Sequence, residues 1–405
     1  MVVMQRLKAL CWILILSVSP ATSQLRGSFA TFISEATLED PSRRSAQIDS
    51  FMTARSRSGF PVTQDSLVYF VFRGKVTSSI TVTGDQNRWS PIGERLENVS
   101  GTNFYYFAEK LEPDARIDYK YIVDREYILD PLNPHTVPGG FGSNSELAMP
   151  GYIQPEEILY DSTISHGSIE TFFSRSKYIG DTLTVKVYLP PDYRTSSGRY
   201  PSIYVHDGLD YLSLASMANV LDKLIAHRKI RPPICVFVPP GADRADKYRL
   251  EKRTQFASFI VKELVPRIDS VYRTDTRPSR RGSMGCSDGG HFALWLGVEY
   301  PETFGLAGGQ SSTITDLLRA PIQRGPKLPV RFYVDVGTYD ILDSSYDFLK
   351  LNREFLRLLD SKGYDVTYAE YHEGHSWGNW RAHIANLLNA LLPYEPALQK
   401  RKRIR

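Results

Sequence analysis

Cysteine is scarce in this chain of 405 residues, which contains three. Cys11 falls in an apolar N-terminal stretch, so only Cys235 and Cys286 remain elsewhere. Two thiols cannot build the disulfide framework that stabilises many small secreted domains, and the paired spacing of a cysteine metal site is absent. The sequence therefore predicts a protein that is stabilised by its hydrophobic core and that uses no metal or other cofactor. Because the two cysteines fall in different predicted strands, we expect no bridge between them.

An excess of one charge sign is also missing. The chain has 49 basic and 45 acidic side chains, and five of the basic ones stand within residues 400–405. The rest of the chain is nearly neutral, so it lacks the basic surface of a nucleic-acid-binding protein. A composition of 42% hydrophobic and 12% aromatic residues excludes a disordered or fibrous chain. We predict no nucleic-acid partner and interpret residues 399–405 as a solvated basic tail.

No apolar run is long enough for a transmembrane helix, which needs about 18 residues or more. The stretch from Ala9 to Val18 is shorter, follows two basic residues and is followed by small residues that end at Ser23. This arrangement is typical of a secretory signal peptide that is cut before Gln24. We predict a signal peptide over residues 1–23, a periplasmic or extracellular mature protein, and no integral membrane span.

The N-terminal third shows the pattern of an all-β domain. Short runs rich in β-branched and aromatic residues are separated by turn clusters, without helical patterns between them. The predicted strands are 67–72, 80–82, 104–107, 117–123 and 127–129. Such a series predicts a small immunoglobulin-like β-sandwich, here over residues 61–150.

One further segment precedes this predicted sandwich, and another forms its C-terminal end. Residues 24–60 are polar with a weak helical pattern around Ile48 and Phe51, and we expect them to form a lead-in segment. The stretch from Asp130 to Gly151 is rich in proline, glycine and asparagine. Its composition predicts a linker or a long irregular loop.

Strands and helices alternate over residues 151–398. The strand patterns are 183–189, 203–205, 234–238, 306–308, 330–336 and 366–371, and the helical patterns are 212–227, 254–264, 290–300, 346–359 and 377–392. This alternation predicts an α/β domain, in which a mostly parallel sheet has helices on both faces. Functional residues in such sheets gather at the carboxyl ends of the strands, so the residues that follow each strand are the candidates for a site.

Ser287 is the candidate nucleophile. It is the third residue of the segment GCSDG, residues 285–289, which fits the Gly-x-Ser-x-Gly pattern between a strand and a helix. A serine on such a sharp turn needs small residues two positions before and after it, because strand and helix crowd together there. Ser283 lacks the first glycine and falls inside the strand, which makes it the weaker candidate.

A serine hydroxyl requires a base that removes its proton. His375 lies in the loop after the last predicted strand, and it is favoured over His372, which stands at the end of that strand. The other downstream histidines, His291 and His383, lie on predicted helices, where we expect surface positions.

The base in turn requires an acid that fixes its tautomer. The acid is expected after the preceding strand, and Asp340 stands in the turn just beyond it, 35 residues before the candidate histidine. Asp343 and Asp347 are alternatives, although either could instead cap the next helix.

An oxyanion needs backbone amides as donors. One candidate is the amide of Asp288, directly after the nucleophile. The second is expected in the loop after the strand 203–205, where Gly208 and Leu209 are both candidates.

These segments together resemble the esterase branch of the α/β-hydrolases that includes enterochelin esterases and the feruloyl and acetylxylan esterases of carbohydrate esterase family 1. The matching segments are GCSDGG at 285–290, YPETF at 300–304, DVGTYD at 335–340, GHSW at 374–377 and the pair Asp243-Arg244. The resemblance implies an α/β-hydrolase fold and a Ser-His-Asp triad. Two positions depart from the family pattern, because Ser376 stands where an aspartate is frequent and Lys247 where an acid is frequent.

The predicted sandwich is similar to the early-set, glycogen-binding-type domain that precedes the catalytic domain of enterochelin esterases. The matching segments are FRG at 72–74, GDQNRW at 84–89, DYKY at 118–121 and LDP at 129–131. Trp89 could be a sugar platform or, more in keeping with its type, a packed tryptophan in the core or between domains.

We therefore predict an exported serine carboxylic ester hydrolase without a cofactor, whose partner is a small-molecule or carbohydrate-linked ester. The resemblance implies a siderophore ester or a feruloyl or acetyl ester of a carbohydrate as substrate. Two alternatives stay open: an acyltransferase on the same fold, and a non-catalytic glycan-binding protein that keeps the hydrolase scaffold.

Overall fold

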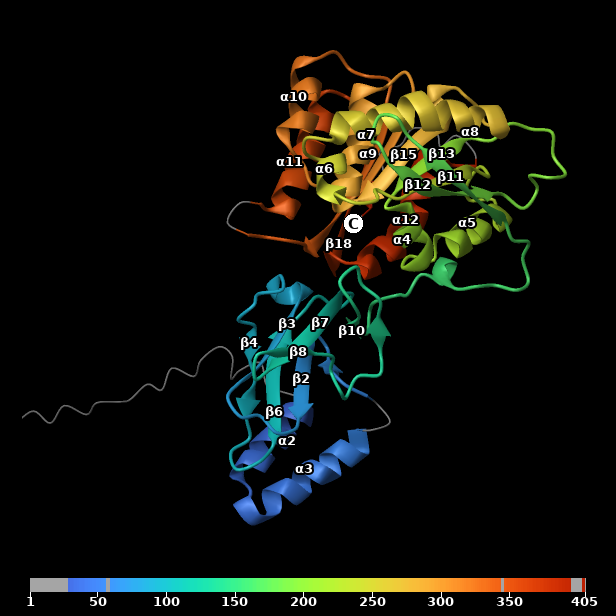
Figure 1. Cartoon of the computed structure of the whole chain (residues 1–405). Coiled ribbons are helices and arrows are strands. Elements are labelled where there is room, and N and C mark those ends of the chain that lie inside the picture. The colour runs from blue at the N-terminus through green and yellow to red at the C-terminus, as the bar shows by residue number, and fades with distance from the viewer. Residues whose placement is uncertain (1–27, 56–58, 344–345, 395–402, 405) are drawn as a thin grey trace, which may run out of the picture.

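The computed structural model describes residues 28–55, 59–343, 346–394 and 403–404. The predicted signal peptide and most of the predicted basic tail lie outside the described residues. The chain folds into a smaller β-rich lobe and a larger lobe with a central sheet (Figure 1).

Two antiparallel sheets form the smaller lobe. One has the order β1 (Val62–Gln64), β2 (Leu67–Arg73), β6 (Phe104–Lys110) and β5 (Glu97–Asn98). The other has the order β4 (Glu94–Arg95), β3 (Ile80–Gly84), β7 (Arg116–Val123), β10 (Asn144–Ala148) and β9 (Thr136–Val137), and β8 (Glu126–Ile128) pairs with β7. Alternate residues of β2, β3 and β7 bury one core between the sheets, which makes this lobe a β-sandwich.

Two helices cover the outer face of the first sheet. They are α2 (Ser28–Leu38) and α3 (Pro41–Arg55). Phe29 and Ile33 of α2 and Ile48 of α3 pack with Tyr69 and Val71, the residues of β2 that point away from the sandwich core. The segment expected as a polar lead-in is therefore packed against the sandwich.

The expectation of a linker or a long irregular loop over residues 130–151 is wrong where β9 and β10 form within this stretch. Within this stretch β10 pairs with β7 from Ser145↔Tyr119 to Ala148↔Arg116. Asp130 is buried, and its backbone N donates to Ser145 Oγ at 2.8 Å. The composition of the segment is that of a loop, but pairing with a central strand outweighs local preference.

A nine-stranded sheet forms the centre of the larger lobe within the described residues. Its order is β11 (Ser168–Arg175), β12 (Thr182–Leu189), β14 (Ile234–Val238), β13 (Ser202–His206), β15 (Arg281–Cys286), β16 (Leu306–Gln310), β17 (Arg331–Tyr339), β18 (Asp365–Gly374) and β19 (Arg403–Ile404). The strands from β14 to β19 run parallel, whereas β11 and β12 are antiparallel to their neighbours. The short β19 pairs with β18, so part of the predicted tail joins the sheet edge instead of lying free.

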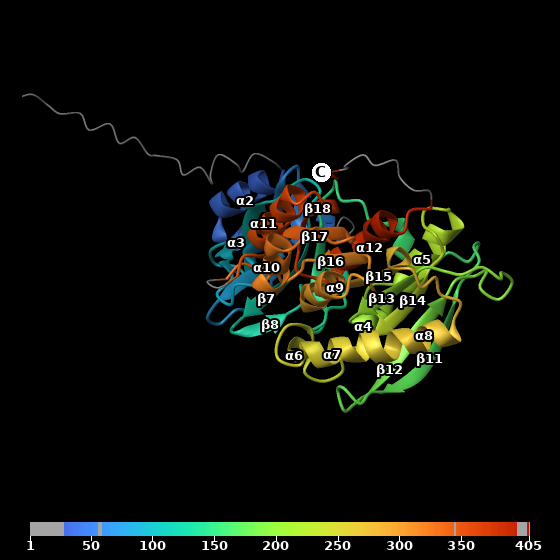
Figure 2. The ribbon, with the colours of Figure 1, turned by 90° about the horizontal axis from the view of Figure 1, so that it is seen from above.

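Helices cover both faces of this sheet (Figure 2). One face carries α4 (Gly208–Ser213), α5 (Met217–Ala226) and α12 (Trp377–Leu391). The other carries α6 (Arg244–Tyr248), α7 (Arg253–Phe259), the short helix η3 (Ile260–Leu264), α8 (Val265–Val271), α9 (Ser287–Glu299), α10 (Asp316–Arg324) and α11 (Phe348–Ser361). Along β14, Val236 faces one core, and Cys235 and Phe237 face the other. The predicted fold class, an α/β sheet preceded by a small all-β sandwich, is confirmed.

Some elements were not predicted. Strand β11 has mostly exposed side chains, so it lacks the apolar pattern of the buried strands. Helix α10 contains Pro321, which disfavours a helix in a sequence pattern. Within residues 28–55, 59–343 and 346–394, no helix combines the length and the apolar character that crossing a membrane requires.

The two described cysteines provide a test of this core. Cys235 and Cys286 are free and buried, on β14 and β15, which are separated by β13. Burial raises the pKa of both thiols, and the thiolate is the reactive form. We predict that neither thiol reacts with Ellman's reagent before unfolding, and that a reducing agent leaves the midpoint of thermal unfolding unchanged. Rapid labelling of the folded protein would contradict this packing.

Candidate active site

Ser287 lies on a sharp turn between β15 and α9. Its φ of +55° is in the left-handed region, which is strained for a residue other than glycine. A Cβ atom at Gly285 would lie 2.6 Å from the backbone of Gly289, and one at Gly289 would lie 2.5 Å from Asp207 Oδ2. The glycines that the sequence pattern singled out therefore let strand and helix approach closely. The serine between them is half-buried, so it stays accessible.

The structure brings the three predicted side chains together. His375 Nε2 lies 2.9 Å from Ser287 Oγ, and His375 Nδ1 lies 2.7 Å from Asp340 Oδ1. They come from the ends of three strands, because Ser287 follows β15, Asp340 follows β17 and His375 follows β18. The side chain of Asp340 is fully buried and that of His375 is 14% exposed. Ser287, His375 and Asp340 thus form one continuous chain of hydrogen-bond contacts, in the order that a serine triad requires.

Two aromatic rings enclose the imidazole of His375. The ring centroids of Phe348 and Trp380 lie 4.9 Å and 5.0 Å from that of His375, both in edge-on orientation. Phe348 is the first residue of α11, and Trp380 lies in the first turn of α12. The sequence did not single out this role for the two aromatic residues, because packing of this kind depends on helices that follow different strands.

The alternative residues have other partners. His372 Nδ1 lies 2.6 Å from Asp114 of the sandwich. Asp343 Oδ1 accepts from the amide of Tyr346 at 2.8 Å, and Asp347 Oδ1 caps α11 by accepting from the amide of Lys350 at 2.9 Å. Within the described residues, His372, Asp343 and Asp347 therefore bind groups other than Ser287 and His375.

Two buried histidines and the second serine are engaged elsewhere. Ser283 Oγ lies 2.8 Å from His206 Nε2 inside the sheet, and burial lowers the pKa of His206 to about 3. His291 is also fully buried, with Nδ1 2.8 Å from the carbonyl of Thr313, and burial lowers its pKa to about 4. Both imidazoles are therefore uncharged at neutral pH.

The expected surface positions of His291 and His383 are wrong. His383 Nε2 lies 2.6 Å from Glu373 Oε1, and its side chain is 12% exposed. Helices α9 and α12, which carry the two residues, are each packed against the sheet, and polar residues such as His291 and Asn379 are among their buried positions.

The predicted oxyanion donors lie at two helix starts. Asp288 is the second residue of α9, and Gly208 and Leu209 are the first two of α4. The first amides of a helix have no partner within it, and the first amide of α4 that donates within its turn is that of Asp210, to Asp207 O at 3.0 Å. A Cβ atom at Gly208 would lie 2.5 Å from Phe237 Cα, so the glycine lets this loop pack against β14.

Two arginines fix these loops. Arg244 donates from Nε and Nη2 to the two carboxylate oxygens of Asp207, each at 2.7 Å. Arg249 Nε donates to Asp288 Oδ1 at 2.9 Å, which also accepts from Thr313 Oγ1 at 2.8 Å. The pair Asp243-Arg244 was part of the family resemblance, but sequence alone assigned neither arginine to the site.

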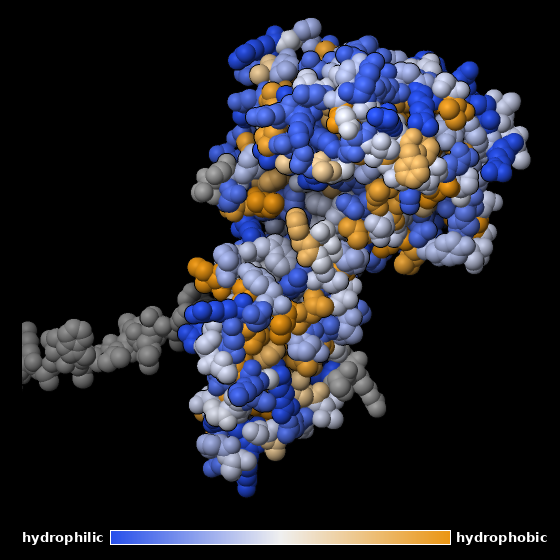
Figure 3. All heavy atoms as spheres, viewed as in Figure 1, coloured by the Kyte–Doolittle hydropathy of each residue, from blue (hydrophilic) through white to orange (hydrophobic). Residues whose placement is uncertain are grey.

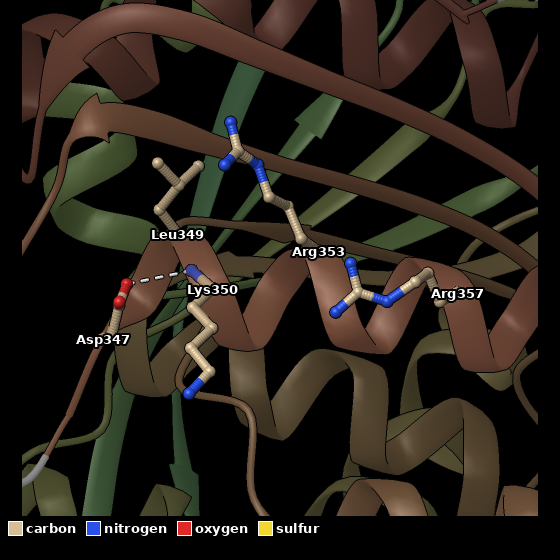
Figure 4. A pocket seen from close by; sticks show the side chains of 5 residues that line it. All are labelled: Asp347, Leu349, Lys350, Arg353 and Arg357. Carbon is tan, nitrogen blue, oxygen red and sulfur yellow. Dashed lines mark hydrogen bonds between the residues drawn. The ribbon is translucent and has the colours of Figure 1, made fainter.

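A shallow surface hollow on α11 is separate from this site. It is lined by Asp347, Leu349, Lys350, Arg353 and Arg357 (Figure 4). Arg353 is already paired with both carboxylate oxygens of Glu370, at 2.7 Å and 2.6 Å. Ser287, His375 and Asp340 are not among its lining residues. Among the residues that the structure describes, no group of three or more His, Cys, Asp or Glu side chains is placed to hold a metal ion.

The sheet order and the serine on the turn after β15 define the larger lobe as an α/β-hydrolase domain. A family model described as "Putative esterase" matches residues 176–391, which is more than half of the chain. The chain therefore belongs to this esterase family, and it is a carboxylic ester hydrolase. The resemblance predicted from the sequence is confirmed.

Two curated relatives each match about half of the chain. The uncharacterized protein YjcH of Bacillus subtilis is 29% identical over 237 residues, which are 56% of this chain and 98% of that protein. The endo-1,4-beta-xylanase/feruloyl esterase of Xylanibacter ruminicola is 29% identical over 203 residues, 47% of this chain but 27% of that protein.

Solved structures match both lobes. The enterobactin esterase FES from Shigella flexneri has a TM-score of 0.69 at 19% identity, and the match covers 85% of this chain and 97% of that one. The ferric enterobactin esterase of Salmonella typhimurium has the same TM-score at 17% identity, with 85% and 98% covered. At these identities the likeness establishes the shared fold of the two lobes.

The contacts of Asp340 generate a direct prediction. Asp340→Asn replaces the carboxylate that contacts Nδ1 of His375 with a neutral amide, so we expect kcat for a p-nitrophenyl ester to fall by about 10²–10⁴-fold. Asp347→Asn is the matched control, since asparagine also caps helices well and the residue lies outside the hydrogen-bonded triad. We expect the control to stay within about threefold of the wild type. Equal effects of the two changes would contradict the assignment of the acid.

Proposed function

We propose that the protein is an exported serine carboxylic ester hydrolase that uses Ser287, His375 and Asp340 as its triad. The observation that carries the proposal is the continuous hydrogen-bond chain from Ser287 Oγ through His375 to Asp340. Its supports are the membership of the esterase family and the position of each residue at the end of a parallel strand.

The geometry supports acyl transfer in two steps. Ser287 Oγ attacks the ester carbonyl while His375 Nε2 takes the hydroxyl proton, and the same proton then passes to the departing alcohol. Water, deprotonated by His375, attacks the acyl-serine and releases the acid, which regenerates the serine. Asp340 keeps the proton of His375 on Nδ1 and stabilises the imidazolium that forms in each step.

The developing oxyanion requires donors next to Ser287. We propose the backbone amide of Asp288 as one donor and that of Gly208 or Leu209 as the other. Removing one such donor typically costs about 3 kcal/mol of transition-state stabilisation. Arg244 and Arg249 hold the carboxylates of Asp207 and Asp288, so the loops that present these amides are fixed before substrate binds.

We further propose that the substrate is a siderophore ester or a feruloyl or acetyl ester of a carbohydrate. The two-lobe likeness to enterobactin esterase supports the first class, and the relatives described as feruloyl esterase and acetyl esterase support the second. The indole Nε1 of Trp89 donates to Asp85 Oδ1 at 2.8 Å, which fits a packed tryptophan better than a sugar platform.

The two serines of the segment 283–287 allow a matched test of the nucleophile. Ser287→Ala should reduce hydrolysis of a short p-nitrophenyl ester by about 10³-fold or more, because the attacking oxygen is lost. Ser283→Ala removes one buried hydrogen bond, which is worth about 1 kcal/mol of folding stability, and should leave kcat within about threefold. Unchanged turnover after Ser287→Ala would refute the proposal.

A substrate panel decides the class. Ferric enterobactin, methyl ferulate and acetylated xylan are compared at equal enzyme concentration, with the Ser287→Ala protein as a blank. We expect turnover of at least one substrate that depends on Ser287, with water as the acyl acceptor. Transfer to an added alcohol in preference to water would identify an acyltransferase instead. Glycan binding without turnover or fluorophosphonate labelling would identify a binding protein.

Export is proposed from the sequence of residues 1–23. We expect N-terminal sequencing of the protein recovered from the periplasm or medium to begin at Gln24. Recovery from the cytoplasm with these residues intact would contradict export.

A further inference from the structure

The β-sandwich contacts the loop that carries His375. Arg116 of β7 is fully buried, and its Nη1 donates to Ser376 Oγ at 3.2 Å. On the other side of the histidine, Gly374 lies so close to Asp85 that a Cβ atom would be 2.1 Å from Asp85 Cγ. Both chain neighbours of His375 are therefore in contact with the other lobe.

The figures place these contacts where the lobes meet. The upper ends of β7 and β10 approach α12 and β18 (Figure 1), and β7 contacts both of these elements. Figure 3 shows the two lobes joined at a narrow waist. The side chains at this waist thus connect the sandwich to the loop that carries His375.

Arg116 is held rigidly from within its own domain. Its Nη1 lies 2.6 Å from Asp118 Oδ1, and its Nε donates to Glu146 Oε1 at 2.6 Å. Asp118 is itself buried, and Glu146 also lies 3.5 Å from Arg381 of α12. Because the guanidinium group is planar, two contacts to carboxylates fix the direction of the donor that reaches Ser376.

Helix α12 is shaped to receive this side chain. A Cβ atom at Gly378 would lie 1.9 Å from Arg116 Nη1, so only glycine leaves room for the guanidinium against the first turn of the helix. Ser376 precedes this turn and is the residue at which the sequence departs from the family pattern. Here its neutral hydroxyl accepts from an arginine that is paired with two carboxylates of the sandwich.

The geometry points to Arg116 as a positioning residue, which fixes the loop 374–378 from the sandwich and thereby aligns His375 with Ser287 and Asp340. This inference rests on the proposed function of these three residues. A small displacement of a catalytic group can lower the rate about 10²-fold. Loss of the guanidinium should therefore lower kcat more than it affects binding of a small ester.

Arg116→Lys is the principal variant. Lysine keeps the positive charge between Asp118 and Glu146, but a single ammonium group cannot reproduce the fixed fork that reaches Ser376. We expect kcat for p-nitrophenyl acetate to fall at least tenfold, with KM within twofold and circular dichroism unchanged. Ser376→Ala should also lower kcat, and it additionally removes the N-cap of α12, which accepts from the amide of Asn379. The double variant should lose little more than Ser376→Ala alone, because both changes remove the Arg116–Ser376 contact.

Asp114→Asn is the matched control. Asp114 contacts His372 across the same junction, at 2.6 Å, whereas the contacts to Ser376 and Gly378 come from Arg116. We expect wild-type kcat and KM for this variant. A second readout is the far-downfield proton resonance of a histidine that is hydrogen-bonded to a carboxylate, which should shift or broaden in Arg116→Lys and not in Asp114→Asn.

Three results would overturn the inference. They are a folded Arg116→Lys protein with kcat within twofold of the wild type, an equal loss in Asp114→Asn, or additive losses of Arg116→Lys and Ser376→Ala. If Arg116→Lys does not fold, Ser376→Ala alone decides, and wild-type kcat in that variant overturns the inference. Failure of the proposed function is distinguishable, because the Ser287→Ala protein would then keep its activity.

Discussion

The structure depends on the close approach of three strand ends at one edge of a parallel sheet. The Ser287–His375 contact is 2.9 Å and the His375–Asp340 contact is 2.7 Å. Both contacts require that the C-terminal ends of β15, β17 and β18 lie side by side at the same edge of the sheet. The sheet supplies this alignment through its register, in which Val336 lies opposite Glu370 and Tyr339 opposite Gly374. Glycines at the serine turn then allow the close backbone packing that exposes the hydroxyl.

Burial is distributed unevenly around this site. The side chain of Asp340 is fully buried and that of His375 is 14% exposed, whereas Ser287 is half-buried. A charged group that is removed from water loses its hydration, so it needs a partner of opposite charge that compensates for this loss. The same reasoning applies where the two lobes meet. Arg116 and Asp118 are both buried there, and their burial is tolerated because they form an ion pair.

Much of the site could be predicted from the sequence, because its signals are local. Ser287 lies in a five-residue pattern, and His375 and Asp340 each follow a strand with a clear apolar run. The alternation of strands and helices specified the fold class for the same reason. Each of these features depends on neighbours within about ten residues.

The rest depends on contacts between distant parts of the chain. Strand β10 lies in a stretch with the composition of a loop, and only its pairing with β7 reveals it. His291 was expected at the surface, but α9 packs its polar positions against the sheet. Arg116 carried no signal at all, since its partner Ser376 lies 260 residues further on. Tertiary packing decides which charged side chains are buried, and the hydrophobic periodicity of the sequence does not predict it.

Mass spectrometry of the fluorophosphonate-treated protein tests the central claim most directly. The account predicts one covalent adduct per chain, located on Ser287, and its loss when Asp340 or His375 is replaced, because the hydroxyl reacts only when the base is aligned. An adduct on Ser283, or no adduct on a folded protein that hydrolyses esters, would contradict the account.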